Sequence, residues 1–167
     1  MALSKITNGG VATSGIPAGG VIQVQTFQRT TYFEQATHGS MADCGVSVNI
    51  TPTSSSSKIL ILVSGTMGND TVGNATVIHL LRDSTKIAVG SSSSTTDYNS
   101  SAFNIGSAAY ETQHFSINHL DSPATTSQIT YKLQMGAYNG DATLGSRGDN
   151  LGALSTPTNI TVMEIAG

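Results

Sequence analysis

Few side chains in this 167-residue chain could carry out catalysis or bind a metal, and they are scattered along the sequence. The chain has four histidines and a single cysteine, Cys44, which can form no disulfide within the chain. His114 and His119 are the nearest pair of histidines, but residues five apart on a strand point to opposite faces. His79 stands in an apolar stretch, where a structural role is expected. This spacing predicts no metal site.

Carboxylates that could act as a general acid and base form no recognisable pattern either. Most aspartates lie in turn-forming clusters, where an aspartate hydrogen-bonds its own turn: Asp70, Asp83, Asp97, Asp121, Asp141 and Asp149. The motifs HExxH, CxxC, GxGxxG and GxSxG are absent. A glycosidase pair, and Ca²⁺ held by loop aspartates such as Asp141 and Asp149, stay open as alternatives. The sequence predicts a non-enzymatic protein without a cofactor.

The composition bears on the class of partner. Seven Lys and Arg residues are spread along the chain and the net charge is −3, which argues against a nucleic-acid partner. The longest apolar run is far shorter than the roughly 20 residues that span a bilayer, so no membrane partner is expected. Ser and Thr, 22 of each, supply most of the surface polarity. The first ten residues lack an apolar stretch of signal-peptide length, and we expect folding in the cytoplasm.

Short alternating stretches separated by turn-forming residues indicate an all-β domain. Each predicted strand places apolar residues mainly on one side, with period two. The predicted strands cover residues 21–28, 44–51, 58–65, 75–90 (a hairpin that turns at Asp83 and Ser84), 109–120, 128–136 and 159–165. No amphipathic helix of ten residues is found. The pattern predicts one antiparallel sandwich or barrel domain over residues 21–167.

Residues 1–20 contain five glycines and one proline and show no helical or strand period. We expect an extended N-terminal arm. It is either a floppy terminus or a tether that becomes ordered against a partner. In the second case the apolar side chains that would anchor it are Leu3, Ile6, Val11 and Ile16.

The stretch "TPTSSSSKILILVSG", residues 51–65, passes abruptly from small polar residues to five aliphatic ones. Proline and hydroxyl residues start the strand sharply. The aliphatic run is apolar on both faces, and so is "VIHLL" at 77–81. A small sandwich buries one face of each sheet, so the second face predicts an oligomer interface formed by Ile59, Leu60, Ile61, Leu62 and Val63. The alternative is that loops of the same chain cover the outer faces.

Several stretches together resemble a small β-domain found in virion proteins of tailed bacteriophages, marine and cyanobacterial phages in particular. They are "IPAGGVIQVQ", "ITPTSSSSKILILVSG", "HLLRDSTKIAVG", "NHLDSPATTSQITYKLQM" and "ITVMEIAG", and they span residues 16–167. The resemblance implies an antiparallel two-sheet jelly roll of the C1q/TNF-like kind, often trimeric. Fibre proteins of this type carry a long shaft before the domain. This chain has only about twenty residues there, which favours a free-standing decoration protein or a very short fibre.

The expected function is therefore structural: a non-enzymatic, trimeric virion protein, assembled in the host cytoplasm, that decorates or stabilises the capsid surface through its N-terminal arm. Its expected partners are its own copies and other virion proteins, the major capsid or a tail protein. The alternative is a tail- or collar-fibre head whose loops 91–101 and 139–150 bind host surface polysaccharide through Tyr98 and Tyr138. A hydrolase acting on capsule is a third hypothesis. The "RGD" at 147–149 lies in a Gly/Asn/Asp-rich stretch and is interpreted as turn material.

Overall fold

A computed structural model of the whole chain describes residues 16–36, 39–91, 99–147 and 154–167. Strands form the regular structure of this part, and it contains no helix. The strands are β1 (Val21–Arg29), β2 (Phe33–Gln35), β3 (Met41–Ile50), β4 (Lys58–Asn69), β5 (Ala75–Arg82), β6 (Thr85–Ile87), β7 (Ala102–Ile105), β8 (Thr112–Asp121), β9 (Ile129–Ala137), β10 (Ala142–Leu144) and β11 (Thr158–Ile165).

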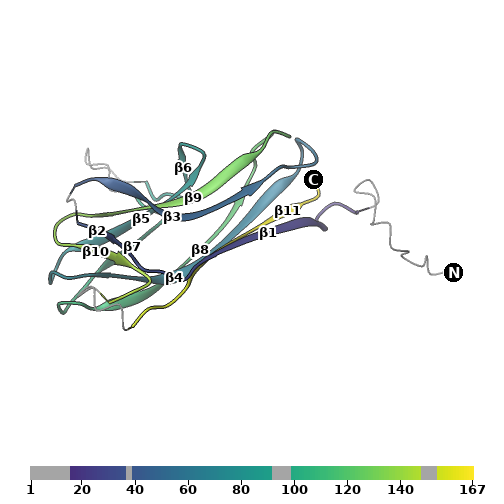
Figure 1. Cartoon of the computed structure of the whole chain (residues 1–167). Helices are drawn as coiled ribbons and strands as arrows, with labels where there is room; N and C mark the ends of the chain where they lie inside the picture. Colours follow the sequence, from purple (N-terminus) through teal and green to yellow (C-terminus); the bar gives the residue numbers. More distant parts are fainter. Residues whose placement is uncertain (1–15, 37–38, 92–98, 148–153) are drawn as a thin grey trace.

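The strands form two antiparallel sheets packed face to face (Figure 1). We call the sheet with strand order β1-β11-β4-β8 the lower sheet and the sheet with order β3-β9-β5-β7 the upper sheet. The short strands β10 and β2 extend the lower sheet beside β4, and β6 lies beside β5. The chain crosses between the sheets at most connections, and this strand order is that of a jelly roll. The predicted all-β, two-sheet jelly-roll class is confirmed.

The core lies between the sheets and follows the alternation of the long strands. Ile129, Tyr131, Leu133 and Met135 of β9 point inward and are at most 2% exposed. Ile59, Ile61 and Val63 of β4 meet them from the lower sheet. The alternation predicted for residues 44–51 places Val46, Val48 and Ile50 in this core, and that predicted for 109–120 places Phe115 and Ile117 there. Period-two burial of this kind specifies the register, because a slip by one residue would turn each strand inside out.

The predicted long strands are present, and three short ones were missed. β2, β7 and β10 have three or four residues each, too few to show a period. β10 and β7 form because the long strands β4 and β5 offer free edge beyond the ends of their other partners, and β2 pairs with β10. The predicted hairpin turn at Asp83 and Ser84 is confirmed. Asp83 takes a left-handed conformation (φ 53°), and its carboxylate accepts a hydrogen bond from the Thr130 amide at 2.9 Å.

Polar contacts join the two sheets at one end of the core. Asp121 on β8 accepts two hydrogen bonds from Arg82 Nη1 on β5, at 2.9 and 3.0 Å. The Tyr131 hydroxyl on β9 donates to the same carboxylate at 2.7 Å. Burial, helped by this hydrogen bond, raises the pKa of Tyr131, so the hydroxyl stays protonated and donates. Asp121 is 7% exposed, and its ion pair is therefore held in a largely desolvated position.

A second buried carboxylate explains why the polar stretch at 51–57 precedes β4. Glu164 on β11 is fully buried and accepts hydrogen bonds from the Thr53 amide at 2.7 Å and the Thr53 hydroxyl at 2.8 Å. Gln23 on β1 donates to the same carboxylate at 2.6 Å. Burial alone would raise the pKa of Glu164, but the hydrogen bonds from Gln23 and Thr53 outweigh it, and the pKa lies below its usual value. The loop is fixed to the sheet by these contacts.

Acid is expected to weaken this corner of the protein. Because the folded-state pKa of Glu164 is lowered, its stabilisation is complete above the unfolded-state pKa of about 4.3 and is lost as the pH falls through the folded-state pKa. Glu164→Gln should lower the free energy of unfolding at pH 7 by about 2 kcal/mol, the worth of hydrogen bonds to a charged group. Urea unfolding of both proteins at pH 7 and pH 3 checks this. The difference should shrink at pH 3, and an equal loss at both pH values would contradict it.

The chain enters the sandwich at the end where it also leaves it (Figure 1). The Gly19 amide donates to the Ala166 carbonyl, and the Ala166 amide donates to the Gly20 carbonyl, both at 2.8 Å. Residues 19 and 20 therefore continue the pairing of β1 with β11. Of the predicted anchor residues, Ile16 is described and half-buried, whereas Leu3, Ile6 and Val11 lie outside the described residues. The arm and its boundary at residue 20 stay a prediction.

Candidate functional site

A row of apolar side chains crosses the outer face of the lower sheet. The strand registers align Val24 of β1 with Met163 of β11, Met163 with Leu60 of β4, and Leu60 with Leu120 of β8. Residues paired across strands lie on the same face of a sheet, so these four form one continuous line. Val24 is 50% and Leu120 49% exposed, and Leu60 and Met163 are half-buried. Leu62 adjoins the line from the next row. We call these five residues the apolar row.

The two rows beyond the apolar row, on the side away from Lys58, are mostly polar and carry their own hydrogen bonds, whereas on the Lys58 side Val21 and Ile165 are apolar and Lys58 is charged. In the neighbouring row, Leu62 pairs with Thr161 and Thr161 pairs with Thr26, and the two threonine hydroxyls lie 3.1 Å apart. In the following row Gln28 donates to Asn159 at 2.8 Å, and Ser64 and Ser116 continue it. These two rows thus form an uncharged platform of amides and hydroxyls, and the apolar side chains of the face gather at one end of it. Such a concentration of exposed apolar groups on a rigid sheet is typical of an interaction surface.

The structure divides the five residues predicted for the oligomer interface. Ile59, Ile61 and Val63 point into the core and are at most 3% exposed, so they pack inside the single chain. Alternation turns Leu60 and Leu62 to the outer face, where they belong to the apolar row. The oligomer interface therefore stays a prediction, and of the five residues only Leu60 and Leu62 lie on the surface that could form it.

The second stretch that is apolar on both faces behaves differently. On β5 the outward side chains Val77, His79 and Leu81 are all at most 5% exposed. The same chain thus buries both faces of this strand. For β5 the alternative expectation, coverage within the chain, is correct.

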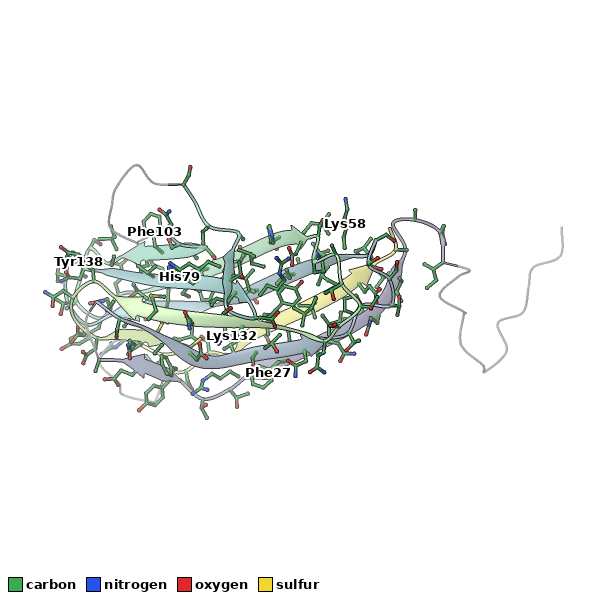
Figure 2. The ribbon with its side chains drawn as sticks, turned by 90° about the horizontal axis from the view of Figure 1, so that it is seen from above. Phe27, Lys58, His79, Phe103, Lys132 and Tyr138 are labelled. Carbon is green, nitrogen blue, oxygen red and sulfur yellow. The ribbon has the colours of Figure 1, made fainter. Side chains whose placement is uncertain are left out.

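A second group of exposed apolar side chains lies at the opposite end of the sandwich. Phe103 on β7 is 65% and Tyr138, which follows β9, is 59% exposed. Figure 2 shows both at the end away from Lys58, the first residue of β4. They line an open groove of about 760 Å³ together with His114 and Ser116 of β8. Tyr98, the other aromatic residue predicted for glycan binding, lies outside the described residues.

The ionisable groups are dispersed in the structure as they are in the sequence. Across residues 16–36, 39–91, 99–147 and 154–167, no three His, Cys, Asp or Glu side chains converge on a possible metal position. His114 and His119 project to opposite faces of β8. Cys44 is 1% exposed, its Sγ donates to the Leu133 carbonyl at 3.2 Å, and burial raises the pKa of the thiol to about 11. Cys44 is therefore a protonated core residue.

Within the same described ranges, no helix is long and apolar enough to cross a membrane.

Similarity to known proteins is confined to solved structures. No protein-family model matches the chain, and no curated protein sequence matches it. One similar structure is the VP2 subviral particle of infectious bursal disease virus, at 13% identity and a TM-score of 0.45, with 99% of this chain and 42% of that chain covered. Another is the T13 particle of that virus, at 12% identity and 0.45, with 100% and 40% covered. The chain spans about two fifths of their length. The jelly-roll assignment above rests on the strand order itself.

Sequence reasoning missed most of the apolar row. Val24, Leu120 and Met163 come from three strands, and only the cross-strand register brings them into line with Leu60. A single-sequence pattern carries no register between distant strands. The one available signal was the aliphatic run at 59–63, which pointed to the right strand and to two of the five residues in the row.

Proposed function

We propose that this chain is a non-enzymatic structural protein of a tailed-phage virion, which forms a homotrimer through the apolar row and attaches to the particle through its N-terminal arm. The observation that carries the proposal is the apolar row, an uncharged, partly exposed line of large side chains on a rigid sheet. The sequence resemblance to phage virion domains supplies the virion setting and the number three. The fold alone does not assign a function.

A second copy of the same chain is the simplest cover for the apolar row. Each large aliphatic side chain left in water forgoes about 1.5–3 kcal/mol of burial. The row runs across all four strands, so copies arranged around a three-fold axis can pack the β8 end, Leu120, against the β1 end, Val24, of the next copy. Contacts of this head-to-tail kind close into a ring when the rotation between neighbouring copies is one third of a turn. The hydrogen-bonded platform beside the row offers polar contacts at the rim of such an interface.

The arm begins next to this surface. Residues 19 and 20 pair with Ala166, and β1, which follows them, contributes Val24 to the apolar row. In a trimer built on the row, three arms would start close together on one end of the assembly. Extended segments can add to the free sheet edge of a partner through backbone hydrogen bonds. Low charge suits close packing of many copies, because charged neighbours in a lattice would repel each other.

Removing the arm tests attachment directly. The chain lacking residues 2–20 should keep its trimeric mass but fail to bind particles that lack the protein, whereas the full chain should bind them. Cosedimentation of both forms with such particles, followed by gel analysis, measures this. If the full chain does not cosediment, the virion role is wrong. If the truncated chain cosediments equally well, the role of the arm is wrong.

A second candidate function is a fibre head that binds host surface polysaccharide. It is favoured by the groove lined by Phe103 and Tyr138, since exposed aromatic rings are common platforms for sugar rings. Under this alternative the truncated chain keeps its sugar binding, and the copy number in the virion is low.

A further inference from the structure

A small groove lies apart from both the apolar row and the Phe103 groove. It has a volume of about 340 Å³, and the residues that give it its chemistry are Tyr110, Thr112, Ser146, Arg147, Ser155 and Thr156. We call it the Arg147 groove. Its described lining contains one cationic side chain and no carboxylate.

The turn before β8 holds Tyr110 at the groove. Tyr110 has a left-handed backbone (φ 63°), unusual for an aromatic residue, and its ring is 43% exposed. Its amide donates to the Asn69 carbonyl at 3.2 Å. Glu111 closes the turn by accepting hydrogen bonds from Gln113, from the amide and hydroxyl of Ser107, and from the Ala108 amide. These lower the pKa of Glu111 to about 2 and keep its charge on the turn. An exposed aromatic residue held in a strained backbone conformation of this kind suggests a binding role.

Arg147 and the hydroxyls form the other walls. The Arg147 guanidinium lies over the Tyr110 ring, 5.9 Å from its centroid. Ser146 and Ser155 are joined by a bridge, and the Thr156 amide donates to the Gly145 carbonyl at 2.9 Å. Ser146 is 2% exposed, and its hydroxyl has no hydrogen-bond partner in the described part of the chain.

We propose that the Arg147 groove binds a carboxylated sugar, such as a uronic or sialic acid unit of a surface polysaccharide. A guanidinium pairs with a planar carboxylate through two parallel hydrogen bonds. The exposed Tyr110 ring offers an apolar surface for the C–H face of a sugar ring, and the hydroxyls of Thr112 and Ser155 offer donors and acceptors for its hydroxyls. The Thr156 hydroxyl already shares a hydrogen bond with the Thr66 hydroxyl at 2.5 Å. This inference is independent of assembly through the apolar row.

Titration with three defined probes tests the proposal. Trigalacturonate and sialyllactose carry the carboxylate, and the methyl ester of trigalacturonate lacks the charge. Two-dimensional NMR of the full chain should show saturable shifts at the Tyr110 amide and Arg147 Nε with at least one acidic probe, and at least 10-fold weaker binding of the ester. Arg147→Ala should weaken binding about 10- to 100-fold, and Arg147→Lys less. Tyr110→Asn removes the ring but tolerates the left-handed backbone, and should weaken binding about 2- to 10-fold.

Two control variants show whether binding depends on this groove in particular. Lys86→Ala makes the same change in net charge elsewhere and should leave binding unchanged. Tyr138→Ala alters the Phe103 groove and should also leave it unchanged. The proposal is overturned if neither acidic probe binds saturably, if the ester or inorganic sulfate binds as well as the acidic sugar, or if Tyr138→Ala abolishes binding and Arg147→Ala does not. The last outcome would support the Phe103 groove instead.

Discussion

Replacing Leu60 by aspartate is expected to convert the protein from a trimer to a monomer that still folds. Leu60 lies at the centre of the apolar row, on the outer face of β4, and contributes to no inward contact of the core. In the trimer each copy would lose about 1.5–3 kcal/mol of apolar burial, and three carboxylates would meet near one axis. The mass in solution, measured by light scattering, should fall from three chains to one chain of 17.2 kDa.

Two comparison variants make this result specific. Ile59→Asp changes the neighbouring residue, which points into the core and is 0% exposed, and should unfold the chain. Val72→Asp changes an aliphatic residue of similar exposure to Leu120, 54% against 49%, in a loop away from the row, and should leave the trimer intact. A folded Leu60→Asp protein that keeps the wild-type mass would show that the row is not an interface, and its far-ultraviolet circular dichroism checks that it is folded.

The second large effect concerns stability rather than assembly. Asp121→Ala is expected to lower the free energy of unfolding by about 3 kcal/mol, because it leaves the Arg82 guanidinium and the Tyr131 hydroxyl without their common acceptor between the sheets. Arg82 keeps 29% exposure, which places the expected cost at the lower end of the range for a broken buried pair. Urea unfolding monitored by circular dichroism measures the change.

An exposed ion pair of nearly the same length provides the matched control. Lys132 and Asp43 lie 2.8 Å apart, with the Asp43 side chain 54% exposed. Asp43→Ala should cost less than about 1 kcal/mol, as exposed pairs do. Tyr131→Phe, which removes only one hydrogen bond to Asp121, should cost about 1 kcal/mol. Equal losses from Asp121→Ala and Asp43→Ala would mean that burial does not set the strength of the Asp121 contacts.

The long strands could be predicted because burial repeats along them every second residue. β9 places four consecutive odd-numbered side chains, from Ile129 to Met135, in the core, and this is visible in the sequence as plain alternation. The turn at Asp83 was equally visible, since aspartate readily takes the left-handed conformation found there. Both features depend on neighbouring residues alone.

The candidate sites could not be predicted in full because they depend on contacts between distant segments. The apolar row needs four strands in register, and the Arg147 groove joins the turn before β8 to the segments around Arg147 and Ser155. Glu164 is in phase with the inward Ile160 and Val162 of β11, and its buried carboxylate depends on hydrogen bonds from Thr53, a residue of a distant loop that a single-sequence pattern does not place there. The aliphatic run at 59–63 was informative about β4, but only alternation in the folded sheet separates Leu60 from Ile59.

The central proposal is that this chain is a structural component of a virus particle, and its copy number in purified particles tests that proposal most directly. Quantitative mass spectrometry should compare this chain with the major capsid protein of the same particles. The account predicts about one trimer for each position of the capsid lattice. A ratio far below that would favour the fibre-head alternative, and the absence of the chain from purified particles would contradict the virion role altogether.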